Sequence, residues 1–481
     1  MAQSLQLSPP TFDLETYASN YEGPLVPLRL AHLALHCPSL SRQSLSLAIA
    51  AAKKGKDVQL YIRLCNLANN LGLADLAQAD SEHVAKQEEA NKRELSRLEG
   101  ELRGYKNNLI RESIRMGQED LATHLLLTGG PPPDPTNLQS QNNSGLNASY
   151  QAFGKMRDYC TTPIHVASMT LRLVFTALLQ AVTAQQMGGA PTTHFNAVLA
   201  NSSRLRSVGV KEEEQVKLTP ISATTMGLAY LGMAQYKDAA TAFLQVPFEY
   251  TQTGPVHSHD FTREVASGND IAIYGGLTAL ATMSREDLMV HVLGGSFRAF
   301  LELEPHMRKA ISLYTTAKYQ ACLDTLRRYY SDWSLDIFLG AGAATPAGSH
   351  VDKLLARIRE KSITAYFSSF SEVSLSALAS TFPPASSSPN AMEDEVLSLI
   401  ENGSLDARLN VVNGILIAPQ KEVRSSAHAE AKKAAEEIER TLLLRLHRVN
   451  VSLAGLEIPK PRSGNSWSGM GGGVQVGNGG Y

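Results

Sequence analysis

The sequence predicts a protein dominated by α-helices: a helical solenoid, then a winged helix, then one long C-terminal helix. Three observations carry this prediction. Apolar residues recur at helical spacing through most of the chain. Small residues lie at the contact positions of a helical hairpin in residues 225–247. Residues 350–419 then show three short helical patterns followed by a β-hairpin, which is the order of elements in a winged helix.

The N-terminal part, residues 12–128, is expected to form helical repeats after a flexible N-terminus of residues 1–11. Within it, residues 81–116 are highly charged, and their apolar residues follow a 3-4-3-4 spacing. Such a seam predicts one long helix that packs along a neighbour. The residues of the seam are Leu95, Leu98, Leu102, Tyr105 and Leu109.

The stretch 129–150 interrupts the helical pattern. It is rich in Pro, Asn and Ser, and it has too few apolar side chains to bury, so we expect a disordered insert. Helical repeats resume in residues 151–349, where the hairpin of residues 225–247 is of the tetratricopeptide type. Each such pair leaves an apolar face that only the next pair covers, and this predicts a solenoid.

The winged helix is expected in residues 350–419. Its hairpin turns at Asn413-Gly414, the dipeptide most typical of a tight β-hairpin. The strand after this turn has neither charge nor proline until Pro419, so we expect it to form an open edge to which a strand of a partner protein adds. The alternative is that a loop of the same chain covers this edge. The residues expected to bind a partner at this edge are Val411, Val412, Ile415, Leu416 and Ile417.

Many winged helices bind DNA, so the charge of the third helix matters. This helix carries Glu393, Asp394, Glu395 and Glu401, and it has no Lys or Arg between Ala391 and Asn402. A recognition helix needs groups that approach phosphates and base edges, and four carboxylates oppose that approach. We therefore expect a module that binds proteins, with DNA binding as an alternative.

A C-terminal helix is expected in residues 420–458, before a disordered Gly-rich tail in residues 459–481. Its apolar residues step mostly by four and three, which draws one stripe along the helix. A single helix of this kind needs something to pack on, and the spacing suits a helix bundle with partner chains. The alternative is a helix that folds back along its own solenoid. The partner-binding residues expected on this stripe are Ile438, Leu442, Leu446 and Val449.

The composition favours an intracellular protein without affinity for nucleic acid or membrane surfaces. The net charge is −2, and 43% of the residues are hydrophobic. We expect no membrane span, because no run of 18 apolar residues occurs, and no signal peptide, because the first ten residues lack a basic start. The four cysteines are far apart, which is typical of reduced thiols.

One pattern resembles a catalytic metal site. His257, His259 and Asp270 have the spacing of the zinc ligands in JAMM metallo-isopeptidases, where zinc activates a water molecule. In this chain, however, Asp260 replaces the proline that follows the second histidine in that family, and Ser267 to Asp270 is typical of a helix N-cap. A zinc isopeptidase remains a remote alternative, and we expect no catalytic residue, metal or cofactor.

The chain is similar to proteins of the PCI-domain family, which scaffold the proteasome lid, the COP9 signalosome and a translation initiation complex. Residues 12–40 resemble the signalosome members of this family more than the proteasome-lid members. The insert at 129–150 departs from both types. The stretches are FDLETYASNYEGPLVPLRLAHLALHCPSL (12–40), YKNNLIRESIRMGQEDLATHLL (105–126) with MRDYCTTPIHV (156–166), and NDIAIYGGLTALATMSRED (269–287) with YTTAKYQACLDTLRRYYSDWSLDIFL (314–339).

This resemblance implies a non-catalytic scaffold subunit of the COP9 signalosome, which removes Nedd8 from cullin–RING ubiquitin ligases. It implies a hetero-oligomer in which PCI strands join side by side and C-terminal helices gather in a bundle. The implied partners are other PCI subunits and components of cullin–RING ligases, in both cytoplasm and nucleus. The alternative is a scaffold subunit of the lid of the 26S proteasome.

Overall fold

The computed structural model divides the chain into two units, which are described separately: the first ends at Ile417 and the second begins at Ala418. The expected flexible N-terminus, 1–11, and all of the Gly-rich tail, 459–481, lie outside the described residues. The model describes residues 12–132, 143–342, 348–383, 390–419 and 423–456.

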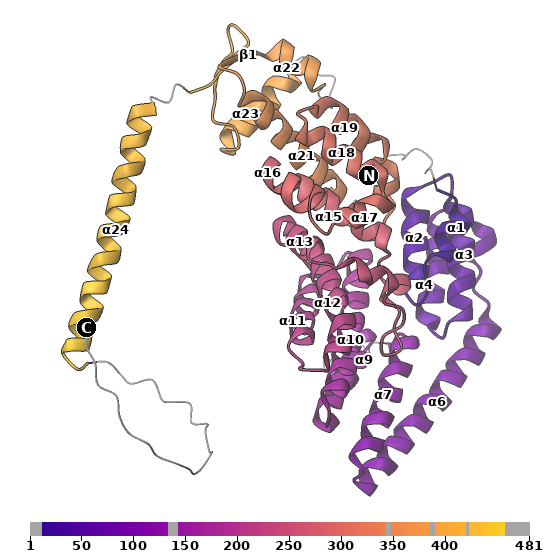
Figure 1. Cartoon of the computed structure of the whole chain (residues 1–481). Coiled ribbons are helices and arrows are strands. Elements are labelled where there is room, and N and C mark those ends of the chain that lie inside the picture. The colour runs from indigo at the N-terminus through magenta and orange to yellow at the C-terminus, as the bar shows by residue number, and fades with distance from the viewer. Residues whose placement is uncertain (1–11, 133–142, 343–347, 384–389, 420–422, 457–481) are drawn as a thin grey trace. The chain divides into compact units, whose positions relative to one another are not determined.

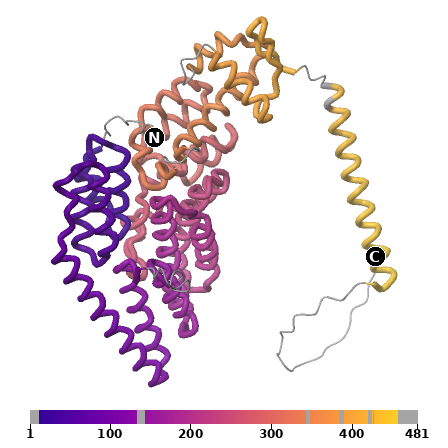
Figure 2. Tube along the Cα trace, turned by 180° about the vertical axis from the view of Figure 1, so that it is seen from behind, coloured from indigo at the N-terminus to yellow at the C-terminus, as the bar shows by residue number. Residues whose placement is uncertain are grey.

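The first unit begins with seven helices in its described N-terminal part, and the last two form a long hairpin that extends from the others (Figures 1 and 2). Asp13, Asp57 and Asp80 cap helices α1, α4 and α6, because each carboxylate accepts a hydrogen bond from a free backbone N–H. The helices are α1 (Leu14–Ser19), α2 (Val26–His36), α3 (Ser41–Lys54), α4 (Val58–Asn70), α5 (Ala74–Ala77), α6 (Ser81–Asn108) and α7 (Arg111–Leu127).

The long helix expected in 81–116 forms and packs along a neighbour, but it is shorter than this range. Helix α6 ends at Asn108, and Leu109 adopts a left-handed conformation with φ +55° that turns the chain back into α7. Leu98 and Leu102 of the expected seam are buried, and Leu102 lies next to Gly117 of α7, whereas Leu109 is 81% exposed. The seam therefore packs α6 against its own successor in sequence.

Part of the expected insert 129–150 is ordered. Helix α9 (Leu146–Lys155) begins inside this range, and the Ser149 hydroxyl donates to the carbonyl oxygen of Ala122 in α7 at 2.8 Å. Phe153 of α9 is fully buried, which explains why the helix starts earlier than the polar composition suggests. Residues 133–142 lie outside the described residues.

The middle of the first unit stacks helices in sequence order, as expected for a solenoid. Gly227 of α12 faces the ring of Phe243 in α13 so closely that an added Cβ would lie 2.6 Å from the ring. The elements are η1 (Met156–Tyr159), α10 (Pro163–Gln186), α11 (Thr192–Arg206), α12 (Glu212–Gly232), α13 (Tyr236–Leu244), η2 (Phe248–Gln252), α14 (Phe261–Glu264), α15 (Gly268–Thr282), α16 (Arg285–Asp287), η3 (Leu288–Leu293), α17 (Arg298–Leu303), α18 (Pro305–Thr315), α19 (Tyr319–Arg328) and α20 (Tyr330–Ser334).

Helix α10 is long and apolar enough to cross a membrane by length and composition alone. Within the first unit, however, 83% of its most apolar window is buried against other helices. Such burial is what the core helix of a solenoid requires, since neighbours cover it on all sides.

The first unit ends in the winged helix, so the predicted fold class is confirmed. This winged helix contains three helices and three short strands, and the strands form a three-stranded antiparallel sheet. The second unit contains one long helix, α24 (Val423–Leu453). The elements of the winged helix are α21 (His350–Phe367), β1 (Glu372–Ser374), α22 (Leu375–Thr381), α23 (Ala391–Glu401), β2 (Arg408–Asn410) and β3 (Ile415–Ile417).

Candidate partner interfaces

The sheet of the winged helix has the order β1-β3-β2, so the strand predicted to be its open edge lies in the centre. Ile417 pairs with Glu372 on one side and with Arg408 on the other. Leu416 is fully buried, and it pairs with Val373 of β1 and Leu409 of β2. The prediction of an edge at 415–418 is therefore wrong, because the three residues of β1 occupy the side that the sequence left open.

The open edges of this sheet are β1 and β2. At the end of β2, the chain enters the turn before β3, and two apolar side chains of this turn face solvent. Val411 is 61% and Val412 is 94% exposed. Both were expected in a strand. Instead they lie in the turn of the β2–β3 hairpin, which we call the wing. Partner binding by Val411, Val412, Ile415, Leu416 and Ile417 stays a prediction.

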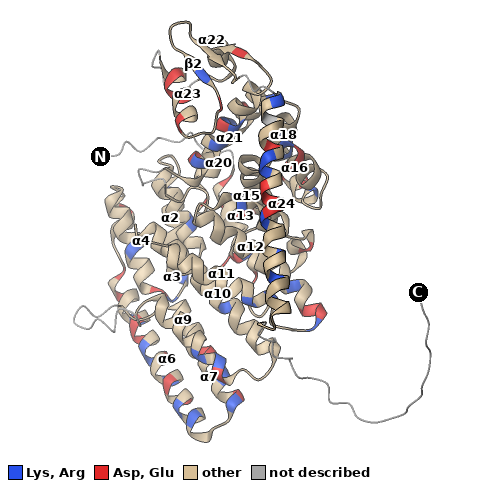
Figure 3. Ribbon diagram, turned by 90° about the vertical axis from the view of Figure 1, so that its left-hand side faces the viewer, with Lys and Arg blue, Asp and Glu red and all other residues tan. Residues whose placement is uncertain are grey.

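The third helix of the module, α23, has the acidic face expected from the sequence (Figure 3). Glu395 is the exception, because its carboxylate accepts two hydrogen bonds, at 2.6 and 2.9 Å, from Arg359 of α21. The half-buried Glu393 and the exposed Asp394 lie in the first turn, where their carboxylates interact favourably with the helix dipole. The preference for protein over DNA stays a prediction.

Helix α24 carries the expected apolar stripe. Ile438, Leu442, Leu446 and Val449 are each more than half exposed in the second unit, as are Leu444 and Leu453. Their contact with a partner stays a prediction.

The residues of the zinc pattern have separate partners. His259 Nδ1 lies 2.8 Å from a carboxylate oxygen of Glu264, and its ring stacks on Phe175. His257, whose pKa is lowered by burial, instead approaches Glu214 at 3.6 Å. Asp270 closes a capping box with Ser267 at the start of α15, as predicted for an N-cap. In the described part of the chain, no group of three potential ligands is arranged to hold a metal ion.

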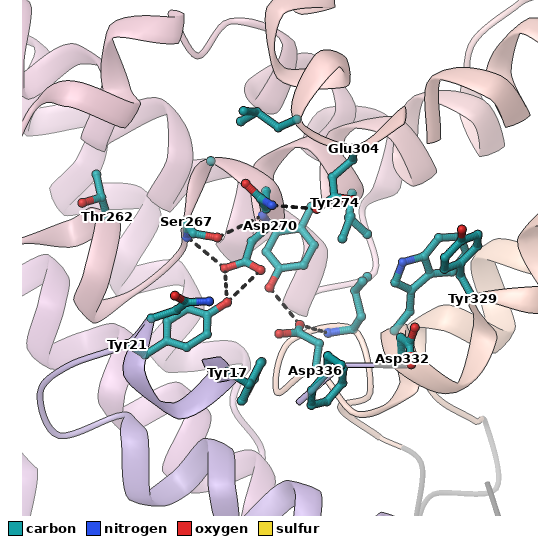
Figure 4. Close-up of a pocket in the computed structure, with 18 of the residues that line it drawn as sticks. Tyr17, Tyr21, Thr262, Ser267, Asp270, Tyr274, Glu304, Tyr329, Asp332 and Asp336 are labelled. Atoms are coloured by element: carbon teal, nitrogen blue, oxygen red, sulfur yellow. Dashed lines mark hydrogen bonds between the residues drawn. The ribbon is translucent and has the colours of Figure 1, made fainter. Parts of the chain in front are cut away.

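Sequence reasoning missed a pocket of about 770 Å³ where α1 meets α15 and α20 (Figure 4). Its wall is aromatic and acidic. Beside it, the Tyr21 hydroxyl donates to the carboxylate of Asp270, with O–O distances of 2.8 and 2.9 Å, and the Tyr274 hydroxyl donates to Asp336 at 2.8 Å. The lining residues that carry this character are Tyr17, Tyr21, Asp270, Tyr329, Trp333 and Asp336.

Arg29 of α2 holds this region together. It is 1% exposed, its Nη1 lies 3.2 Å from the carboxylate of Asp336, and its Nη2 donates to the carbonyl oxygen of Val265 at 2.5 Å. The guanidinium carbon lies 4.0 Å from the centre of the Tyr21 ring. Burial raises the pKa of Asp270, and the positive charge of Arg29 opposes that rise. This arrangement clamps the N-terminal helices onto α15.

A solenoid that runs into a winged helix of this topology defines a PCI-domain protein, and the model of the PCI domain matches residues 323–420. The model of the family described as 26S proteasome subunit RPN7 matches residues 80–130 and 144–290. The gap between the two RPN7 segments falls inside the range of the insert.

Comparison with individual proteins over most of their length identifies the family of the chain more specifically. It is 38% identical to COP9 signalosome complex subunit 1 of Emericella nidulans over 93% of this chain and 84% of the relative. It is 32% identical to the Neurospora crassa protein of that name, covering 90% and 89%, and 31% identical to the Arabidopsis thaliana protein, covering 91% and 89%. The chain belongs to the COP9 signalosome complex subunit 1 family.

Proposed function

We propose that the chain is a scaffold subunit of a COP9 signalosome, assembled with other PCI subunits, and that it has no catalytic role of its own. The observation that carries the proposal is identity over nearly the whole chain to relatives named as subunit 1 of that complex. The buried tyrosine–carboxylate network supports a structural role, because its groups are engaged with one another inside the fold.

Assembly rests on the two surfaces described above. The wing offers an open strand, β2, together with the exposed side chains of Val411 and Val412. Main-chain pairing at such an edge supplies affinity, and neighbouring side chains supply specificity. Helix α24 offers its apolar stripe to helices of other subunits.

The proposal extends to components of cullin–RING ligases as partners and to residence in cytoplasm and nucleus. Both rest on the family resemblance. A place in the lid of the 26S proteasome is the second candidate, favoured by the match to the RPN7 family. Mass spectrometry of the proteins that co-purify with the tagged chain separates the two candidates, because the companion subunits differ.

The wing is tested by replacing both of its valines with aspartate, Val411→Asp with Val412→Asp, in a reconstitution with the other subunits. Charge at this tip should reduce co-purification of the neighbouring PCI subunit at least tenfold, while circular dichroism stays unchanged because both side chains face solvent. Val216→Asp is the matched control, since Val216 of α12 is 59% exposed. Equal recovery of the complex with the double variant and the control would contradict the proposal.

A further inference from the structure

The free end of the α6–α7 hairpin carries a surface that the assembly interfaces do not include. We call it the hairpin tip and define it as Arg103, Lys106, Leu109, Ile110 and Arg111. In Figures 1 and 2, the end of this hairpin lies far from the winged helix within the first unit.

Leu109 is held in an unfavourable conformation at this tip. Its φ of +55° lies in the left-handed region, which is unfavourable for a residue with a Cβ, and helices that end this way usually have Gly or Asn at that position. Leucine at this position therefore calls for a reason other than the turn.

The leucine side chain contributes little to the packing of the hairpin. Leu109 is 81% and Ile110 is 55% exposed, so two aliphatic side chains project from the end together. The core between the two helices is made one to two turns further back, by Leu102 and Ile114, with Tyr105 against Gly117. Strain that is retained with an exposed apolar side chain points to a binding function.

The charges around these side chains have one sign. From Arg103 to Arg111 the sequence has three cations and no carboxylate. The flanking carboxylates are already paired: Glu101 with Arg97 at 2.5 Å and Glu112 with Arg115 at 2.6 Å. Among the described residues, Arg103, Lys106 and Arg111 have no carboxylate partner within ion-pair distance, and blue ribbon marks the ends of α6 and α7 in Figure 3.

We propose that the hairpin tip docks into an apolar pocket rimmed by Asp and Glu on a protein outside the PCI assembly. Leu109 and Ile110 enter the pocket, and the three cations face the acidic rim, which steers the encounter and fixes its orientation. A nucleic acid offers phosphates but no apolar pocket in reach of two aliphatic side chains. A membrane surface would call for a larger apolar face than two residues.

The experiment uses the full chain in its own complex, with a photo-cross-linking amino acid in place of Asn107. After illumination and purification, mass spectrometry should identify a cross-linked peptide from a protein that is not a PCI subunit, at a site where Asp or Glu flank apolar residues. Leu109→Gly and Lys106→Glu should each lower the cross-link yield at least tenfold. Lys86→Glu is the control. Lys86 is an exposed lysine near the start of α6, far from the hairpin tip, so this substitution should leave the yield unchanged.

Two further measurements separate binding from folding and from assembly. Leu109→Gly should leave the melting temperature equal or higher, because glycine relieves the left-handed strain. Chains with substitutions at the hairpin tip should still co-purify with the other PCI subunits. Loss of the cross-link is therefore distinguishable from loss of the proposed scaffold role. The proposal is overturned by absence of a cross-link, by a site without carboxylates, or by equal yield in the variants. Binding of a DNA duplex or of phosphatidylserine vesicles that Lys106→Glu abolishes would also overturn it.

Discussion

Replacing Arg29 with methionine should loosen the clamp between the N-terminal helices and α15. Methionine keeps much of the apolar volume but removes the cation, so Asp336, whose side chain is 14% exposed, is left without its ion partner. Breaking a buried pair from one side costs about 3–5 kcal/mol. The low end applies, at roughly 3 kcal/mol, because Asp336 keeps hydrogen bonds from Tyr274 and from two backbone N–H groups.

Hydrogen exchange measures this loss without the assumption that the whole chain unfolds in one step. A tenfold change in an equilibrium corresponds to about 1.4 kcal/mol, so the amides of α2 and of the first turn of α15 should exchange about a hundredfold faster. Adding Asp336→Asn to the variant should recover part of the protection, since the unpaired buried charge is then removed.

Arg42→Ala is the matched control, because Arg42 pairs with Asp75 at the surface, with side chains 70% and 75% exposed. Such pairs contribute about 0–1 kcal/mol, so the control should change exchange by less than about fivefold. If Arg29→Met accelerates amide exchange no more than the control does, the clamp does not hold the N-terminal helices and the reasoning is refuted.

Two other predictions concern the second unit and pH. Truncation after Pro419 should leave the melting temperature of the isolated chain unchanged while partner subunits are lost, since the stripe with Ile438 and Leu442 is exposed; a clear drop would show that α24 stabilises its own chain. Burial lowers the pKa of His32 and His350 from 6.5 to about 4. Between these values only the unfolded state binds the proton, so stability falls as pH falls, by about 2 kcal/mol per histidine at pH 5. Between pH 7 and 5, the melting temperature of His350→Gln should fall less than that of the unsubstituted chain. Equal losses would contradict the lowered pKa of His350.

The helices and the wing could be predicted because their signals are local. Asn413-Gly414 fixes the turn, and helical periodicity is readable over ten or more residues. The central position of β3 could not be predicted, since β1 has only the three residues Glu372–Ser374, too few for an alternation to be recognised. The break at Leu109 was hidden for a different reason: leucine continues an apolar seam, and nothing in its type announces a left-handed turn.

The clamp was missed because its partners are distant in sequence. Arg29 and Asp336 are 307 residues apart, and no periodicity links them. One signal was present: Arg29 lies within the apolar run Leu28 to Ala34, where a charge can be buried only with a partner. This burial predicts a long-range ion pair for Arg29, although it does not identify Asp336 as the partner.

The sequence separation of Arg29 and Asp336 also delays their contact while the chain is being synthesised. A ribosome that adds roughly 5–20 residues per second needs about 15–60 s to proceed from Arg29 to Asp336. Throughout that interval the guanidinium has no carboxylate to meet, and the ring of Tyr21 has no Asp270 for most of it. The helices that are synthesised first therefore complete their packing late, and a nascent chain exposes this surface to chaperones until the last repeats have folded.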